Sequence, residues 1–317
     1  MATSTGRSPA ATGWATTTSQ PHLDAALATL RVRAADWQNT SLGRRIELLD
    51  ATIATTVAQA ADWVAVCADI QQTADTPWAP EGWLTGVVPV VRYLALLRDT
   101  LDDIATNGRP QPPRMGTRPD GQVVVEVLPT SSADRLLFRD YLAEVRVTPG
   151  VALPEAQSRM GRIYREPPAD GPQVALVLGA GNVSSLAPLN VLHQLFAERR
   201  VALLKSHPVL APLGPLIGAA FAPLVEEGVF RLVYGGSDVG AALARHNDVD
   251  TIHLTGSIAT YNALQAAGAQ PADDRDVADG AQPADDRDAS DGAATITTTV
   301  RRLDKPVHAE LGNVTPV

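Results

Sequence analysis

The sequence predicts an α/β fold organised around a doubly wound parallel sheet. Short apolar runs rich in β-favouring residues alternate with stretches whose apolar residues recur at helical spacing. The runs are apolar at nearly every position, as expected for strands buried on both faces of a parallel sheet. They are VALVLG (174–179), VALLK (201–205), FRLVY (230–234) and TIHLTGS (251–257). The expected fold is a Rossmann-like sheet, preceded by a helical region and a β-hairpin that protrudes.

Candidate binding residues follow the first strand, because parallel α/β sheets bind ligands at the carboxyl ends of their strands. Gly179, Ala180 and Gly181 form a glycine-rich turn before a helix, which could offer backbone N–H groups to a phosphate. Since Ser184 replaces the third glycine of the dinucleotide-binding pattern, a tight turn without a ligand fits equally well. Asn182 could donate its amide to a developing oxyanion, or merely tolerate the turn geometry.

The other strand ends supply further candidates. Lys205 ends the second strand and could hold a ribose hydroxyl or a phosphate, although most lysines are simply solvated. His207 could act as a base, but because it precedes a proline in a loop it is interpreted as a polar surface residue. Gly235 follows the third strand and allows close approach of a ligand or of the next helix. Thr255-Gly256-Ser257 opens a helix after the fourth strand and is a second candidate phosphate cradle.

Composition excludes several classes of protein. The net charge of −9 over 317 residues is concentrated in the segment 268–291, which carries eight Asp and two Arg; the remainder is only −3. No basic stripe is present, so nucleic acid is not an expected partner. No apolar run reaches the ~20 residues of a membrane helix, and no secretory signal is visible. The single cysteine, Cys67, excludes an internal disulfide, fits a cytoplasmic location and is interpreted as a small buried hydrophobe.

Patterning divides the chain into six regions, which follow in order. They are a disordered tail (1–20), a helical region (21–110), a loop and β-hairpin (111–172), the Rossmann-like core (173–265), a disordered acidic insert (266–294) and a terminal strand (295–317). Helical spacing extends from about residue 23 to 72, with Thr40 or Ser41 as the cap of a second helix. Residues expected to face a core are Trp37, Leu48, Leu49, Ile53, Val57, Ala60 and Trp63.

Two later segments alternate like half-exposed strands, QVVVEVLP (122–129) and AEVRVTPG (143–150). They follow a helix over 87–105 that Asn107-Gly108 closes. The two strands could pair within the chain or with another subunit. In the acidic insert, GAQPADDRDVAD is followed by GAQPADDRDASD, identical at ten of twelve positions. The Asp spacing does not match a calcium loop, so a solvated loop and no metal are expected.

Five segments, in this order, resemble the aldehyde dehydrogenase superfamily. They are Asn182 at a strand end, Lys205 at the end of VALLK, EEGVFRLVYGG, HNDVDTIHLTGS and KPVHAELGNVTPV. The resemblance covers about 173–317 and, in the style of its helices, 37–108. GAGN (179–182) also resembles the acyl-CoA reductase relatives, which share the architecture and run the chemistry in reverse.

The resemblance implies NAD- or NADP-dependent oxidation of an aldehyde. In the family a cysteine thiolate attacks the aldehyde, hydride passes to the nicotinamide cofactor, and a glutamate activates the water that releases the acid. By position, Asn182 is implied to be the oxyanion donor and Glu310 the general base. Lys205 is implied to hold the adenosine ribose, while the turns at 179–181, Gly235 and 255–257 are implied to lie beside the cofactor.

The sequence departs from the family in three places. The catalytic cysteine of the family lies downstream of the ELG motif in a second domain, and Cys67 does not correspond to it. The acidic residue that often follows the ribose-binding lysine of the family is replaced around His207-Pro208. The preference for NAD or NADP therefore stays open. Gly181 stands where the family usually has an aromatic residue.

These departures lead to three hypotheses. The chain belongs to the aldehyde dehydrogenase lineage, or it is a truncated member that lacks its catalytic domain and does not turn over, or it is a non-enzymatic partner. As a partner it would bind a nicotinamide dinucleotide, or pair through 122–165 with a second copy or a full-length relative. We favour the second hypothesis. A missing domain is expected to leave apolar surface exposed near Leu254 and the terminal strand.

Overall fold

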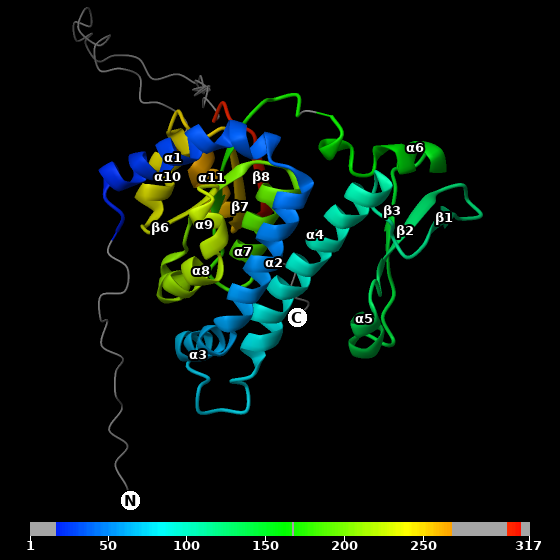
Figure 1. Cartoon of the computed structure of the whole chain (residues 1–317). Helices are drawn as coiled ribbons and strands as arrows, with labels where there is room; N and C mark the ends of the chain where they lie inside the picture. The colour runs from blue at the N-terminus through cyan, green and yellow to red at the C-terminus, as the bar shows by residue number, and fades with distance from the viewer. Residues whose placement is uncertain (1–16, 167, 268–302, 312–317) are drawn as a thin grey trace, which may run out of the picture.

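The computed structural model describes residues 17–166, 168–267 and 303–311 (Figure 1). Nearly all of the predicted acidic insert, and residues 1–16 of the predicted tail, lie outside these ranges. The tail itself is shorter than predicted. Thr18 donates its N–H to the carbonyl of Tyr234 at 3.0 Å, and the Tyr234 N–H donates to Thr18 Oγ1 at 2.9 Å. The first helix, α1 (Gln20–Asn39), begins directly after this contact.

A five-stranded parallel sheet forms the centre of the molecule, in the order β6-β5-β4-β7-β8. Its strands are β4 (Val174–Leu178), β5 (Val201–Lys205), β6 (Phe230–Val233), β7 (Thr251–Gly256) and β8 (Val307–Leu311). The chain adds strands on one side of β4 and then returns to add β7 and β8 on the other. This reversal is the topological switch point at which doubly wound sheets form a ligand crevice. The predicted α/β class, the four strands and the terminal strand are confirmed.

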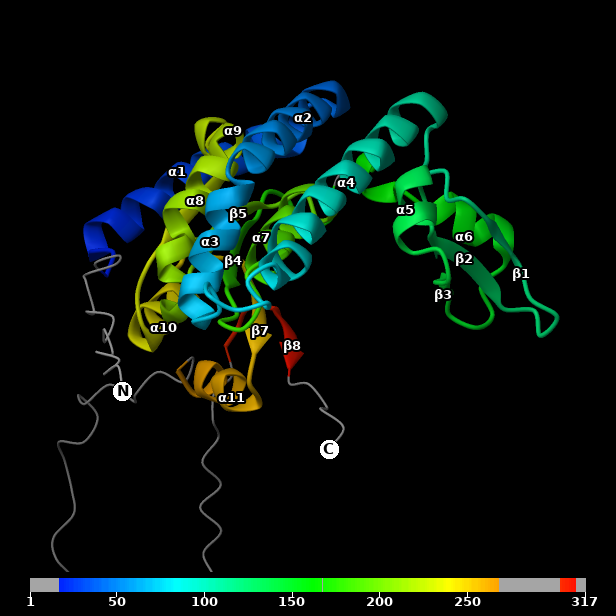
Figure 2. The same ribbon diagram turned by 90° about the horizontal axis from the view of Figure 1, so that it is seen from below.

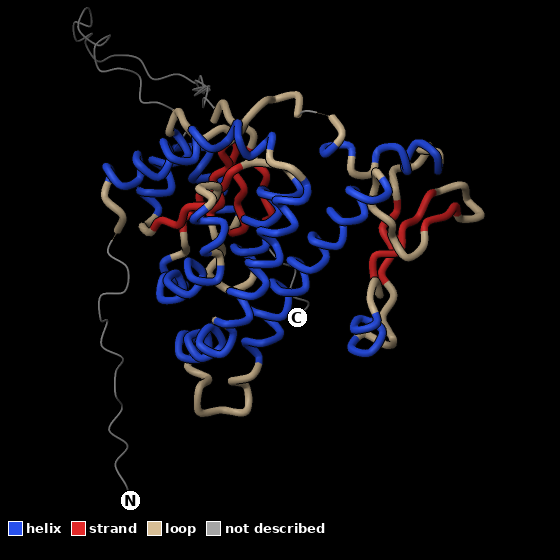
Figure 3. Tube along the Cα trace, viewed as in Figure 1, coloured by secondary structure: helices blue, strands red, loops and turns tan. Residues whose placement is uncertain are grey.

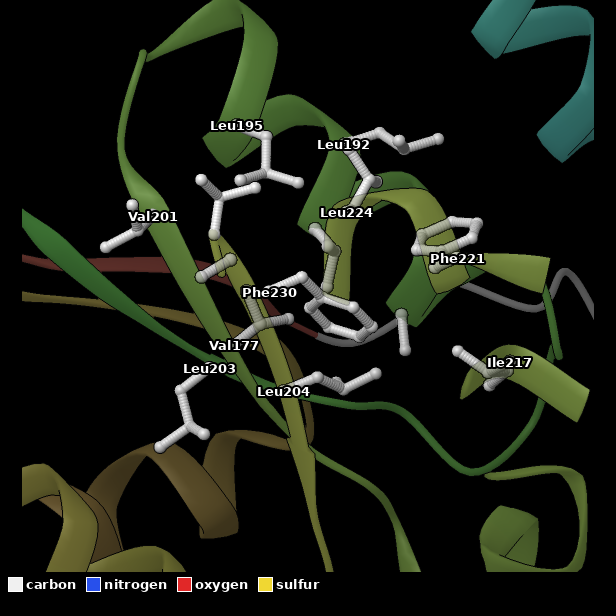
Figure 4. Close-up of a cluster of buried hydrophobic side chains, with 14 of the residues drawn as sticks. Val177, Leu192, Leu195, Val201, Leu203, Leu204, Ile217, Phe221, Leu224 and Phe230 are labelled. Carbon is white, nitrogen blue, oxygen red and sulfur yellow. The ribbon is translucent and has the colours of Figure 1, made fainter. Parts of the chain in front are cut away.

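The central strands form because their side chains are apolar on both faces. Every residue of β4 and β5 is buried, including the backbone-paired Val177 and Leu204. Figure 4 shows Val177, Leu203 and Leu204 of the sheet with Phe221 and Phe230, whose rings meet edge to face at 5.7 Å between centroids. The sheet therefore rests on apolar burial, the main favourable term in folding.

Helices cover both faces of this sheet (Figure 2). The connections from β4 to β6 are α7 (Leu186–Leu192), η3 (His193–Ala197), η4 (Pro208–Leu213), α8 (Gly214–Ala220) and α9 (Ala222–Glu226). Helix α10 (Ser237–Arg245) follows β6 and α11 (Ile258–Ala267) follows β7. Because the second group connects strands in the opposite direction, right-handed crossovers place it on the other face of the sheet.

The N-terminal helices differ in part from the prediction. The helical pattern divides into α2 (Leu42–Ala58) and α3 (Ala60–Gln71), which meet at 56°. Ser41 caps α2, since its hydroxyl accepts the Arg44 N–H at 3.2 Å. The predicted core residues are buried or partly buried except Val57, which is 55% exposed. Val57 lies within α2 next to Thr56, which continues the buried face of Leu48, Leu49 and Thr52, so Val57 itself turns away from the core.

Helix α4 (Val88–Asn107) packs along α2 and follows a short π-helix, η1 (Trp83–Val87). Gly108 ends α4 in a left-handed conformation, with φ of 75°, as the Asn107-Gly108 signal predicts. No single helix among the residues that the structure describes is long and apolar enough to cross a membrane. Only the bent pair α2 and α3, taken together, has the required length and composition.

Beyond α4 lies a second, separate sheet, which we call the outlying sheet (Figures 1 and 3). It comprises β1 (Met115–Thr117), β2 (Val123–Leu128) and β3 (Ala143–Arg146), all antiparallel. A short helix, α5 (Ser132–Leu137), joins β2 to β3, and α6 (Leu153–Arg159) with η2 (Arg162–Tyr164) leads back to the central sheet. The predicted strands 122–129 and 143–150 are thus paired, but in a three-stranded sheet with a helical connection rather than in a simple hairpin.

Polar contacts tie the outlying sheet to the rest of the molecule. Arg92 of α4 donates from Nε and Nη2 to the two carboxylate oxygens of Asp134 in α5, both at 3.0 Å. Asp134 is buried, and Thr130 adds two more hydrogen bonds to it. Near the return to the core, the Tyr164 hydroxyl donates to the carbonyl of Phe196. These contacts connect the outlying sheet to α4 at one point and the segment after it to the central domain at another.

Candidate functional site

A cavity of about 900 Å³ opens at the carboxyl edge of the central sheet. It lies beside the switch point between β4 and β7. Residues from four strand ends and two helices line it. They are Leu178, Gly179, Ala180, Gly181, Asn182, Lys205, His207, Pro208, Ser237, Asp238, Gly240, Ala241, Leu254, Thr255, Gly256, Ser257, Thr260, Ala263, Leu264 and Glu310. All but one of the residues predicted for the site are therefore brought to one place.

The exception is Gly235, which does not line the cavity. A Cβ built on Gly235 would lie 2.4 Å from Cγ2 of Val239, in the first turns of α10. The glycine therefore allows β6 to turn closely onto the following helix. The sequence left open whether Gly235 allows close approach of a ligand or of the next helix. In the structure Gly235 lies against α10 and does not line the cavity.

The glycine-rich turn after β4 packs against the end of β5. The Gly179 N–H donates to the carbonyl of Lys205 at 3.1 Å, and a Cβ on Gly179 would lie 3.2 Å from that of Ala187. Gly181 has still less room, because its Cβ would lie 2.4 Å from Nδ1 of His207. The two glycines therefore let the turn after β4 pack closely against Ala187 and the His207 ring.

Lys205 is the buried cation of the site. It ends β5, is 8% exposed and lines the cavity. No hydrogen bond joins its ammonium group to another residue among those that the structure describes. Burial lowers the pKa of Lys205 below its ordinary value, and the charge of Asp238 opposes this effect. A cation held in a cavity without a bonded partner can hydrogen-bond to an anionic or hydroxyl-rich ligand.

Two consecutive hydrogen bonds connect α7, β7 and β8 at the cavity. Asn190 is buried and donates from Nδ2 to Oγ1 of Thr255 at 2.9 Å. Thr255 in turn donates to Oε2 of Glu310 at 3.3 Å, its neighbour in the β7–β8 register. Because the hydroxyl already accepts from Asn190, its own hydrogen is directed to the carboxylate. Glu310 thus lines the cavity, and one of its carboxylate oxygens accepts a hydrogen bond from Thr255.

Ser257 and Asn182 also line the cavity. The Ser257 hydroxyl accepts the N–H of Thr260 at 3.0 Å, which caps the first turn of α11. Gly256 precedes it and leaves the start of α11 open to the cavity. Asn182 is exposed, and within the described chain no hydrogen bond engages its amide. An unengaged amide at this edge can donate to a ligand oxygen.

Two residues of the cavity, His207 and Asp238, and Asn190, which donates to the cavity residue Thr255, had no role in the site predicted from the sequence. His207 was assigned to the surface, yet it lines the cavity between the two glycine-rich strand ends. Asp238 places a carboxylate near Lys205. Asn190 could have been suspected, since it is a polar residue on an otherwise apolar helix. The placement of His207 depends on the path of residues 206–208, which no local pattern encodes.

The one cysteine is remote from this chemistry. Cys67 is buried in α3 and does not line the cavity. Burial raises the pKa of its thiol, although hydrogen bonds with Ser184 and Trp63 oppose this. The interpretation of Cys67 as a small buried residue is confirmed. Within the described part of the chain, no group of three or more His, Cys, Asp or Glu side chains could hold a metal ion.

Comparison with protein families finds one match, the aldehyde dehydrogenase family, over residues 140–275. This segment includes Asn182, Lys205 and Thr255–Ser257 but ends before Glu310. Comparison with curated proteins finds no match.

Solved structures share the fold at low identity. One is glyceraldehyde-3-phosphate dehydrogenase GapN from Methanocaldococcus jannaschii complexed with NADP, 13% identical, with a TM-score of 0.54 over 95% of this chain and 48% of that chain. Another is a mutant of proline utilization A from Bradyrhizobium japonicum, 16% identical, with a TM-score of 0.51 over 94% of this chain and 22% of that chain. This chain thus spans less than half of either protein. The resemblance to the aldehyde dehydrogenase superfamily is confirmed, since residues 140–275 of this chain match the model of the aldehyde dehydrogenase family.

Proposed function

We propose that this chain binds NAD or NADP in the cavity at the carboxyl edge of its central sheet. The observation that carries the proposal is the convergence of the glycine turn, Lys205 and the start of α11 on one cavity. Its volume of about 900 Å³ is within the usual range for cofactor sites. The neighbour GapN, which was solved with NADP, has the same fold and supports this choice of ligand.

The residues present fit a dinucleotide in three ways. The turn after β4, residues 179–181, lines the cavity, so that phosphate oxygens can approach its backbone beside the His207 ring. Lys205 supplies a cation that is not hydrogen-bonded to another described residue and can hold a ribose hydroxyl or a phosphate. Between α10 and α11, the small residues Gly240, Ala241 and Ala263 leave room for a flat ring such as adenine.

The reaction class that these residues serve is oxidation of an aldehyde. The nicotinamide, when bound, supplies the hydride acceptor. Asn182 would donate its amide to the carbonyl oxygen, stabilising the negative charge that develops there. Glu310, hydrogen-bonded through Thr255 to Asn190, would take a proton from the attacking water. The reverse direction, reduction of an acyl thioester, uses the same two groups and is the alternative within this class.

We further propose that this polypeptide does not complete that reaction alone. The covalent route needs a thiolate next to the carbonyl. Cys67 is the only cysteine of the sequence, and it is buried in α3, away from the cavity and with a raised thiol pKa. Neither property suits a nucleophile. The chain would accordingly act as a dinucleotide-binding module of the aldehyde dehydrogenase type.

Titration with NADH and NADPH, followed by ligand fluorescence, tests the proposal. We expect saturable binding without aldehyde turnover, and binding about tenfold weaker in Lys205→Ala through loss of a charged hydrogen bond. Lys305→Ala is the matched control, because Lys305 is a partly buried lysine just before β8 that donates instead to the carbonyl of His246. Absence of binding, or equal effects of the two substitutions, would contradict the proposed dinucleotide site. Turnover of an aldehyde would contradict the proposal that this chain does not complete the reaction alone.

A second candidate is association through the outlying sheet, favoured by its exposed apolar side chains. Leu136, Leu137, Tyr141 and Leu142 are each more than 60% exposed in the connection between β2 and β3. Patches of this kind mark contact surfaces in soluble proteins. We propose a second copy of the chain as the partner. Light scattering that gives the monomer mass at all concentrations would exclude this candidate.

A further inference from the structure

The ring of His207 occupies the space that a side chain at position 181 would fill. A Cβ on Gly181 would lie 2.4 Å from Nδ1, 2.6 Å from Cε1 and 2.9 Å from Cγ of His207, all closer than real Cβ contacts allow. The two residues follow neighbouring strands, β4 and β5. The aromatic residue that the family usually carries before Asn182 is thus replaced, in this chain, by glycine and a ring supplied from the next strand.

A hydrogen bond sets the orientation of this ring. His207 Nδ1 accepts the backbone N–H of Val209 at 3.2 Å, which caps the 3₁₀ helix η4. Since Nδ1 accepts, the neutral imidazole carries its proton on Nε2. Burial, and then the charge of Lys205, lower the pKa of His207 below its ordinary value. At pH 7 the ring is therefore neutral, with a single N–H donor.

That donor has no hydrogen-bond partner in the part of the chain that the structure describes. Nε2 forms no hydrogen bond there, while the ring lines the cavity beside Lys205 and the glycine turn. A half-buried N–H beside a buried ammonium group suits an oxygen-rich ligand better than an apolar one. The carboxylate of Asp238 lies on the α10 side of the cavity, and its charge acts on Lys205.

We propose that His207 is a ligand-binding residue of this cavity, whose Nε2–H donates to a phosphate or ribose oxygen of the bound dinucleotide. Gly181 is its structural counterpart, because any side chain there would displace the ring. The proposal rests on the proposed function, namely dinucleotide binding in this cavity. It adds His207 to the residues that would contact the dinucleotide. It also separates two roles of His207, namely capping through Nδ1 and ligand binding through Nε2.

His207→Asn separates these roles. An asparagine before Pro208 can still accept the Val209 N–H through its amide oxygen, but its shorter side chain does not reach the position of Nε2. We expect a melting temperature close to that of the unsubstituted chain and binding of NADH and NADPH about tenfold weaker, as for loss of one hydrogen bond to a charged group. His207→Ala should weaken binding equally and also lower the melting temperature.

Gly181→Ala tests the contact between the two residues. Its methyl group must displace the imidazole, so binding should again weaken about tenfold. In the double variant, Gly181→Ala with His207→Asn, the displaced group is already absent. We therefore expect the same tenfold loss and not a hundredfold one, since substitutions that remove one interaction are not additive.

The outcomes separate this inference from the proposed function. If the unsubstituted chain binds neither dinucleotide, both fall. If it binds and His207→Asn binds equally well, or if the losses multiply in the double variant, the inference alone is overturned. A loss shared by NADH and NADPH supports a contact with the pyrophosphate or ribose. A larger loss for NADPH supports a contact with its additional phosphate.

Discussion

Every residue of β4 and β5 is buried, whereas no residue of β3 is. The central sheet is held by apolar side chains on both of its faces, and its stability should depend little on pH. The outlying sheet buries few side chains, chiefly Val123, Val124 and Ala156, and depends on the ion pair between Arg92 and Asp134. The site belongs to the first region and the exposed apolar surface to the second.

The difference shows how one chain distributes rigidity. A cavity that must hold a ligand in a fixed geometry is formed on strands fixed by burial, and its polar groups lie only at the strand ends. A sheet that extends into solvent is positioned by a few directional contacts, each of which can be removed without disturbing the core. If a substitution in one region lowered stability equally in the other, the two regions would not be independent.

The largest effect is expected in the central sheet. Leu203→Ala removes a fully buried side chain from β5 and should lower the free energy of unfolding by about 3 kcal/mol, the usual cost of a core cavity. Urea unfolding followed by circular dichroism measures this. The matched control is Val145→Ala in β3, where 53% exposure predicts a change below about 0.5 kcal/mol. Equal losses at the two positions would contradict the division into two regions.

Removal of the ion pair should give the next largest effect, and only locally. Arg92→Ala leaves the buried Asp134 carboxylate with only its local partners, chiefly Thr130, at a cost of about 2 kcal/mol, below the fully buried case because Arg92 is partly exposed. Hydrogen exchange should accelerate in β2 and β3 but not in β4 and β5. Arg98→Ala is the control on the same helix, since its ion pairs are solvent-exposed and worth about 0.5 kcal/mol at most.

How far the sequence predicted the two regions follows from the same physics. Strands buried within the sheet are encoded by apolar runs, so β4 to β7 were predicted correctly. The edge strand β8 was also predicted, although its sequence VHAEL is more polar and more exposed. The outlying sheet is encoded by tertiary contacts. Nothing adjacent to Asp134 in the sequence indicates that it pairs with Arg92, and no alternation of residues predicted α5 between β2 and β3.

The site divides in the same way. Asn182, Lys205, Thr255 and Glu310 follow or end strands, and strand ends meet at one edge whatever the loops do. Gly235 was misplaced because a glycine after a strand can face either a ligand or a helix, and the choice depends on the neighbouring Val239. His207 was missed because its ring reaches back across the turn after another strand.

Acid should loosen the outlying sheet before the central one. The guanidinium of Arg92 and the Thr130 donors hold the pKa of Asp134 well below the ordinary carboxyl value. A lowered folded pKa means that this stabilisation is complete above the unfolded value of about 4 and is lost as the pH falls further, through the folded value. Hydrogen exchange below pH 4 should therefore lose protection first in β2 and β3. In Arg92→Ala most of this pH dependence should be absent, and its persistence there would assign the transition to other carboxylates.

The smallest effect on stability, with a clear change in another property, is expected for the exposed leucines. Leu136 and Leu137 are 80% and 69% exposed on α5, whereas Leu254, near which exposed surface was predicted, is only 2% exposed. Replacing both leucines with serine should change the free energy of unfolding by less than about 0.5 kcal/mol. Binding of a dye that reports apolar surface should fall markedly, because the patch lies on the outlying sheet. Ile258→Ser, beside the cavity and 61% exposed, is the control for the original expectation. A larger decrease in dye binding for this variant would place the main exposed apolar surface beside the central sheet and remove the reason to expect association through the outlying sheet.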